Sequence, residues 1–172
     1  MHAAHRAFFC IPLLWLILLA TAPAQDDPGK AKLGQVCVTV YYATNGDPAA
    51  GGAKAAKVSA KTQALLRSKP QLDFKNYRVL GADTQALLRS YESWAQPLKP
   101  SDEILVRFEA RSLPTATMTQ LDLELWLSRK KILKTDARLQ GNRALFILGP
   151  EWRGGRLIVT VGLADDEKSG TK

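Results

Sequence analysis

Two carboxylates on one predicted strand are the residues whose type and spacing could do chemistry. Asp122 and Glu124 alternate along residues 119–127, which places both side chains on one face, about 7 Å apart by the rise of a strand. Paired carboxylates can hydrolyse a glycosidic bond, provided that one of them has a raised pKa. In the register derived below, Lys134 lies opposite Glu124 and would lower its pKa. We therefore expect no catalytic residues, with a carboxylate-dependent hydrolase of cell-wall or polysaccharide substrates as the alternative.

Histidine-based chemistry is confined to the first residues of the chain. His2, His5 and Cys10 all lie in an apolar N-terminal stretch that is predicted to be removed. Without it the chain lacks the usual general base at neutral pH. The sequence also lacks the short motifs of serine nucleophiles, phosphate-binding loops and zinc sites. We expect no metal and no cofactor.

Cys37 is the one cysteine of the predicted mature chain and cannot close an intramolecular disulfide. It lies within the apolar run 36–42, which favours a buried and inert thiol. The alternative is that Cys37 crosslinks two copies of the chain in an oxidising compartment.

A concentration of positive charge is the second feature with chemical potential. The chain has a formal net charge of +8, and residues 129–156 hold eight basic and two acidic side chains. With neighbouring aromatic residues they could bind an anionic polymer, lipid headgroups or an acidic protein surface. The alternative is that the basic side chains cover apolar surface and protect a sheet edge. The candidate ligand-binding residues are Trp126, Lys134, Arg138, Phe146, Trp152 and Arg153.

The elements that must position these residues are mostly strands. Residues 36–42 are rich in β-branched and aromatic side chains, which predicts a first strand. Residues 58–69 carry apolar side chains at helical spacing between Ser59, a potential cap, and Pro70. Further strands are predicted over residues 76–80, 84–91, 103–111, 119–127, 131–139, 143–148 and 156–163. This order predicts an α+β fold, mostly antiparallel β, as a sandwich-like or two-layer sheet with one N-terminal helix.

The register of the C-terminal strands can be predicted because one face must stay apolar. We expect a three-residue turn at 128–130, since a two-residue turn at Arg129 and Lys130 would place Leu125 opposite Lys134. A second turn at 140–142, flanked by Leu139 and Arg143, continues the sheet. The expected opposite pairs are Leu125–Leu133, Leu123–Thr135, Trp126–Ile132, Glu124–Lys134 and Asp122–Asp136. The expected core face is Leu121, Leu123, Leu125, Leu127, Leu133, Ala137, Leu139, Leu145, Ile147, Leu157, Val159, Val161 and Leu163.

Residues 1–24 have the organisation of a secretory signal. Arg6 supplies a positive charge, residues 7–20 are apolar, and the small residues Ala22 and Ala24 precede a predicted cleavage before Gln25. Retention as an anchor is the alternative, although the run is shorter than the roughly 20 residues of a spanning helix. Export predicts a periplasmic or extracellular protein, with at most peripheral membrane association and no nucleic-acid partner.

The remaining sequence is predicted to form one domain. Residues 25–35 are polar and form a flexible lead, and residues 36–164 form a single α+β domain. Within it, residues 43–57 are rich in Gly, Ala and Pro and predict a mobile connection. Residues 149–155 have the composition of a turn, and residues 165–172 are expected to be a disordered tail.

Three segments carry a resemblance to known proteins. Residues 74–80 (FKNYRVL), 145–150 (LFILGP) and 154–159 (GGRLIV) resemble segments of small uncharacterised exported bacterial proteins, with a strand-helix-strand start and C-terminal β-hairpins. The last hairpin also resembles the strand-loop-strand ending of secretin-type envelope β-domains. The resemblance implies export and this fold, and it supplies no catalytic residue. We therefore expect a non-enzymatic envelope or periplasmic domain that binds an envelope protein or an anionic envelope component, in a role accessory to a secretion or pilus system.

Overall fold

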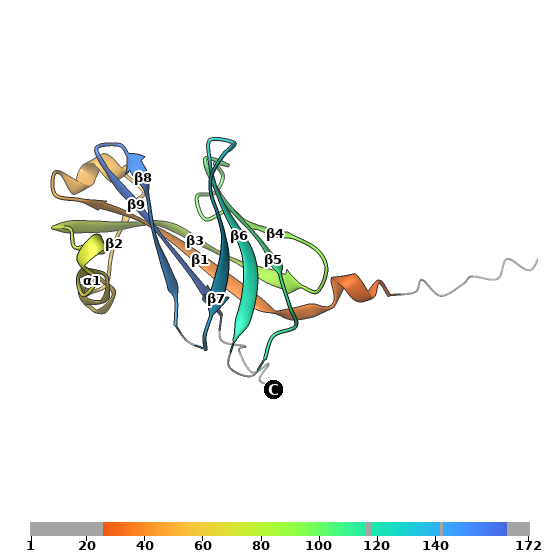
Figure 1. Cartoon of the computed structure of the whole chain (residues 1–172). Coiled ribbons are helices and arrows are strands. Elements are labelled where there is room, and N and C mark those ends of the chain that lie inside the picture. Colours follow the sequence, from red (N-terminus) through yellow and green to blue (C-terminus); the bar gives the residue numbers. More distant parts are fainter. Residues whose placement is uncertain (1–25, 116–117, 142, 165–172) are drawn as a thin grey trace, which may run out of the picture.

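The structure is a computed structural model that describes residues 26–115, 118–141 and 143–164 (Figure 1). The predicted secretory signal at 1–24 and the predicted tail at 165–172 lie outside the described residues. Among the described residues, no helix is both long and apolar enough to cross a membrane.

The described chain forms strands β1 (Lys32–Thr44), β2 (Ala56–Lys57), β3 (Asn76–Leu88), β4 (Ser93–Ala95), β5 (Ile104–Ala110), β6 (Thr119–Leu127), β7 (Lys130–Leu139), β8 (Leu145–Trp152) and β9 (Gly155–Leu163). Its helix α1 spans Ala60–Arg67, and the 3-10 turns are η1 (Pro28–Lys30), η2 (Pro48–Gly51) and η3 (Pro70–Leu72). Ser59 caps α1 as predicted, since its side chain accepts a hydrogen bond from Thr62 N.

The strands form two antiparallel sheets. The first sheet has the order β2-β3-β1-β9-β8, and the second has the order β4-β5-β6-β7. Helix α1 lies against the first sheet, on the side away from the second (Figure 1). The prediction of a mostly antiparallel α+β fold with one helix is therefore confirmed for the described residues.

One buried cluster draws on both sheets. Val36, Val38 and Val40 of β1 have no exposed surface, because alternate residues of a strand point to the same side. Phe108 of β5 and Leu123 of β6 belong to the same cluster. Every residue of the predicted core face is either buried in this cluster or packed against it. The apolar alternation of the C-terminal strands therefore identified the core correctly.

The β6–β7 hairpin has the predicted central register and a different turn. The pairs Leu125–Leu133, Leu123–Thr135, Glu124–Lys134 and Asp122–Asp136 are all present. The turn has two residues, Ser128 and Arg129, both with positive φ, as tight hairpin turns require. A bulge between Leu125 and Trp126 absorbs the difference, so Trp126 lies opposite Lys131. The predicted three-residue turn and the Trp126–Ile132 pair are wrong.

Strand β8 does not continue the sheet of β7. Gln140 pairs with Arg143 in a short bridge, so Leu139 and Arg143 do not flank the turn as predicted. The chain then enters the first sheet, where β8 pairs with β9. The apolar pattern could not separate these arrangements, because both sheets contribute to the same cluster.

Strand β3 is one strand where two were predicted. Gly81 lies between the predicted strands 76–80 and 84–91, but β3 runs through it. A side chain at Gly81 would place its Cβ 1.9 Å from the carbonyl oxygen of Pro97. Opposite this point the register of β1 shifts between Val40 and Tyr41. The glycine marks a close approach of two backbones.

Three segments expected to be irregular contain regular structure. The predicted lead at 25–35 contains η1 and the start of β1, and the predicted connection at 43–57 contains η2 and β2. Strand β8 extends through Gly149 and Pro150 to Trp152, which leaves a tight turn at Arg153 and Gly154, both with positive φ. Cys37 is half-buried, so the prediction of a buried thiol is wrong.

Candidate functional site

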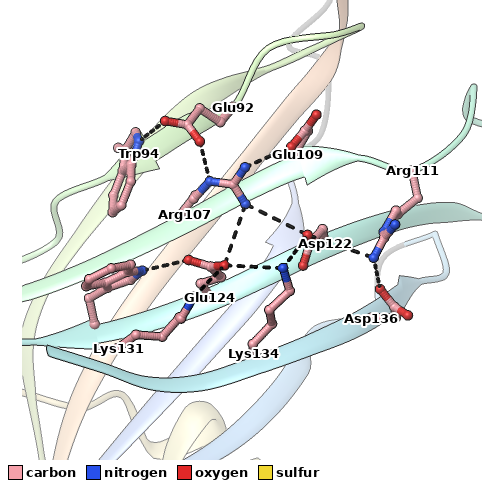
Figure 2. A network of polar contacts seen from close by, with 11 residues as sticks. Glu92, Trp94, Arg107, Glu109, Arg111, Asp122, Glu124, Lys131, Lys134 and Asp136 are labelled. Atoms are coloured by element: carbon pink, nitrogen blue, oxygen red, sulfur yellow. Dashed lines mark hydrogen bonds and ion pairs between the residues drawn. The ribbon is translucent and has the colours of Figure 1, made fainter.

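The two candidate catalytic carboxylates lie in a network of ion pairs on the second sheet (Figure 2). Arg107 of β5 is at its centre, with a side chain 16% exposed. Its Nε donates to Glu92, and its Nη2 donates to Glu109 Oε2 at 2.8 Å. Its Nη1 lies 3.9 Å from both Asp122 Oδ2 and Glu124 Oε1. One guanidinium therefore faces four carboxylates.

Two lysines of β7 complete the network. Lys134 Nζ lies 3.2 Å from Asp122 Oδ2 and 3.5 Å from Glu124 Oε1, which confirms the predicted Glu124–Lys134 pair. Lys131 Nζ lies 3.2 Å from Glu124 Oε1. The network thus surrounds two nearly buried carboxylates with cations from both neighbouring strands.

The unfavourable Asp122–Asp136 pair has a visible compensation. Arg111 Nη2 lies 3.0 Å from Asp136 Oδ1 and 3.9 Å from Asp122 Oδ2. A cation between opposite carboxylates offsets their repulsion across the strands. The Oδ1 atom of Asp122 is buried and has no hydrogen-bond partner among the described residues.

The surroundings keep Glu124 ionised. Burial by itself would raise the pKa of Glu124, but hydrogen bonds from Lys131 and Trp126 outweigh burial and hold its pKa below the ordinary value. Hydrogen bonding to Asp122, together with the charge of that carboxylate, raises the pKa of Lys134. A hydrolytic pair needs the opposite shift in one carboxyl group.

The lowered pKa of Glu124 predicts a stability that depends on pH. A carboxyl group with a folded-state pKa below the unfolded value of about 4.3 stabilises the fold above that pH and loses this contribution as the pH falls through the folded-state pKa. We expect Glu124→Gln to give a shallower fall in the free energy of unfolding between about pH 5 and pH 2 than the unsubstituted chain. Urea unfolding at a series of pH values measures this dependence. An equal fall in the free energy of unfolding for both proteins would contradict the prediction.

Trp126, the first of the six candidate binding residues, is held within this network. Its Nε1 donates to Glu124 Oε2 at 3.0 Å, its ring centroid lies 5.8 Å from that of Trp94, and Lys131 Nζ lies 5.5 Å from the Trp126 centroid. Arg138 is exposed at the far end of β7 and lines a polar hollow of about 350 Å³ with Arg111 and Asp136.

The other three candidate residues lie in β8 of the first sheet or in the turn that follows it. Trp152 is 8% exposed; its Nε1 donates to Glu103 Oε1 at 2.7 Å, and the Cζ of Arg153 lies 4.1 Å from its ring centroid. Phe146 packs against the second buried cluster, which includes Leu66 of α1. The structure does not bring the six candidate residues together on one sheet, because β8 pairs with β9 and not with β7.

Sequence reasoning missed where unpaired positive charge is concentrated. Residues 45–78 and 143–156, which we call the basic region, hold ten basic and three acidic side chains, a net charge of +7 out of +8 for the chain. In the parts of the chain that the structure describes, one ion pair reaches this region, between Arg153 Nη2 and Glu103 Oε2 at 4.0 Å. Counting charge along residues 129–156 identified three of the ten basic side chains of the region. It could not show that Arg129, Lys131 and Lys134 are paired with acidic residues.

The basic region contains a cleft and a groove. The cleft, of about 470 Å³, lies beside Trp152 and includes Arg153, Arg156 and Phe74 in its lining. The groove consists of two hollows of about 410 and 450 Å³ that share Lys69, Ala144 and Phe146. Within it, Lys69 Nζ lies 4.8 Å from the centroid of the Phe146 ring.

These hollows combine aromatic and aliphatic surfaces with cationic side chains, a combination that suits a ligand with both acidic and apolar groups. A scan against protein-family models, a search of curated proteins and a search of solved structures each found no match to this chain.

Proposed function

We propose that this chain is an exported, non-enzymatic domain that uses its basic region to bind an acidic envelope protein or an anionic envelope component. The observation that carries the proposal is the distribution of charge. The second sheet pairs Arg107, Lys131 and Lys134 with carboxylates, whereas the basic region has a net charge of +7 and a single long ion pair among the described residues. Charge concentrated in this way steers an anionic partner and contributes to its affinity.

Export is proposed from the organisation of residues 1–24, and the resemblance to small exported bacterial proteins supports it. A periplasmic or extracellular location places an anionic cell envelope within reach of the basic region. An accessory role in a secretion or pilus system remains part of this proposal.

We also infer that the two sheets pack as a sandwich-like body. The shared buried cluster supports this architecture, because Val38 and Val159 of the first sheet lie in the same cluster as Phe108 and Leu123 of the second. Such a body would present the outer face of the first sheet, with the basic region, as a surface for binding.

The alternative function is a hydrolase that acts through Asp122 and Glu124. Their adjacency on β6 and the unpartnered Oδ1 atom of Asp122 favour it. The cations around both groups and the lowered pKa of Glu124 favour the binding proposal. A hydrolase would show turnover of a cell-wall or polysaccharide substrate that Asp122→Asn or Glu124→Gln abolishes.

Charge reversal in the basic region tests the binding proposal. We expect the triple variant Lys57→Glu, Lys61→Glu and Lys75→Glu to bind immobilised polyglutamate at least tenfold more weakly, roughly, than the unsubstituted chain at low salt. All three side chains are exposed and form no ion pair among the described residues, so the fold should be unaffected.

The matched control removes the same charge elsewhere. The triple variant Lys32→Glu, Arg89→Glu and Lys130→Glu changes three exposed cations outside the basic region. We expect it to weaken binding by less than about threefold, since screened charges act mainly over about 10 Å. Equal losses in both variants, or no binding of polyglutamate by the unsubstituted chain, would refute the proposal.

A further inference from the structure

The open edge of the first sheet lies beside the groove of the basic region. Strand β8 is the last strand in the order β2-β3-β1-β9-β8, so among the described strands it has a neighbour on one side. Residues 145–148 pair regularly with β9, and a register shift follows at Gly149 and Pro150. Proline cannot donate a backbone hydrogen bond, so the usable edge ends there.

The ladder shows which backbone groups of β8 face this edge. Ala164 N donates to Gln35 O at 3.0 Å, and hydrogen-bonded residues alternate along an antiparallel pair. Counting along β9 from this bond, Val159 and Val161 direct their backbone groups toward β8, where they meet Ile147 and Leu145.

The residues that alternate with Leu145 and Ile147 on β8 have the opposite orientation. Phe146 and Leu148 therefore direct their N–H and C=O groups away from β9 and toward the edge.

The same two residues carry apolar side chains on the outer face of the sheet, where Phe146 is half-buried and Leu148 is exposed. Leu148 is 38% exposed, and Leu65 of α1, across the groove from Phe146, is 50% exposed. Lys69 and Arg143 line the same groove and form no ion pair in the described part of the chain. Backbone donors and acceptors, apolar side chains and two cations thus lie together.

We propose that an extended peptide segment with apolar and acidic side chains adds as a strand to residues 145–148 of β8. Its backbone would pair with Phe146 and Leu148, its apolar side chains would enter the groove against Leu65, and its carboxylates would meet Lys69 and Arg143. This inference rests on the proposed function, and names an extended acidic peptide as the partner.

The shape of the groove favours a peptide over a lipid surface. Its two hollows lie between the α1–η3 segment and β8, and a flat bilayer cannot follow a concave surface of this size. A lipid headgroup also offers no repeat of donors and acceptors to match the alternating groups of an open strand. A strand of a partner protein offers both.

A designed peptide tests the inference directly. The probe is the acetylated and amidated nonapeptide Glu-Glu-Val-Thr-Val-Thr-Val-Glu-Glu, and its control is the same peptide with methylated amide nitrogens at the five central residues. Both have the same side chains and charge, but the control cannot donate to an open edge. We expect the control to bind at least about tenfold more weakly in calorimetry. In the complex, the amides of Phe146 and Leu148 should exchange more slowly with solvent.

Two protein variants localise the peptide. Leu65→Ser removes an exposed apolar side chain from the groove, and Ile132→Ser removes a side chain 38% exposed on the second sheet. We expect the first variant to weaken peptide binding by about three- to tenfold, because the peptide would no longer bury part of a leucine side chain. We expect the second variant to leave peptide binding unchanged. Because both side chains are exposed, neither variant should unfold the chain.

The outcomes separate this inference from the proposed function. If the methylated peptide binds as tightly as the probe while polyglutamate binding still depends on Lys57, Lys61 and Lys75, strand addition is wrong and the proposed function stands. If phosphatidylglycerol vesicles bind, the peptide does not, and Leu65→Ser abolishes vesicle binding, the groove serves a lipid surface. A stable dimer in sedimentation that excludes the peptide would assign β8 to a second copy of the chain.

Discussion

Replacing Arg107 by methionine is expected to lower the free energy of unfolding by about 2–3 kcal/mol at pH 7. The substitution keeps a side chain of similar length but removes the one cation that faces Glu92, Glu109, Asp122 and Glu124 together. The value lies below that for a fully buried pair, because Glu92 and Glu109 are partly open to water. Urea unfolding measures the loss.

The control for Arg107 is a solvent-exposed ion pair of the same sheet. Arg129→Met removes the pair between Arg129 and Asp102, in which both side chains are exposed, and we expect a loss of less than about 0.5 kcal/mol. Lowering the pH should reduce the difference in free energy of unfolding between Arg107→Met and the unsubstituted chain, because protonating the remaining carboxylates relieves their repulsion. Equal losses in the free energy of unfolding for the two variants would show that Lys131 and Lys134 alone compensate the negative charge of the carboxylates.

Replacing Gly81 by alanine is expected to cost about 3 kcal/mol or more, a large effect for one methyl group. The new Cβ would lie 1.9 Å from the carbonyl oxygen of Pro97, and 3.0 Å from its carbon. The obstacle is backbone, which cannot rotate aside like a side chain, so β3 and the segment after β4 must move apart. Thermal or urea unfolding measures the loss.

Gly46→Ala is the matched control for Gly81. Its Cβ would lie 3.6 Å from Thr44 Oγ1, an ordinary contact, and Gly46 has no positive φ. We expect a change within about 0.5 kcal/mol. A similar loss in the free energy of unfolding for both variants would show that the backbone at Pro97 can move away from Gly81 at little cost in free energy.

The sequence predicted those parts of the fold that depend on alternation along single strands. The apolar residues of β6, β7 and β9 fixed the core face and the central register of the β6–β7 hairpin, because a one-residue slip would bury Glu124 and Lys134 in the core. The same alternation could not show that β8 joins β9. A strand with one apolar side fits either sheet when both contribute to a common core.

The errors at glycines and turns have a related cause. Gly81 lies in the gap between two predicted strands. A glycine can turn the chain or, within a strand, allow another backbone to approach closely, and local sequence does not separate these roles. Ser128 and Arg129 adopt positive φ although neither is glycine or asparagine, so the two-residue turn has no composition to identify it.

The candidate site was predicted only in part, because the sequence gives the charge of each side chain but not the residue with which that side chain pairs after folding. The Glu124–Lys134 pair followed from register and was found. The basic region depends on which cations remain unpaired after folding, and Lys69 and Arg143 meet in one groove although 74 positions separate them in sequence. No count along the chain contains that information.

The pairing of β1 with β9 sets the order in which this protein can fold. The two strands lie at opposite ends of the described chain, yet they are neighbours in the middle of the first sheet. A nascent chain therefore cannot complete that sheet until residues 155–163 have emerged from the ribosome. Pairing between such distant segments slows folding, and until then β1 can pair with β3 on one side while its other side stays open. The second sheet, whose strands follow one another along the chain, does not depend on β9, so the two sheets differ in how early their strands can pair during synthesis.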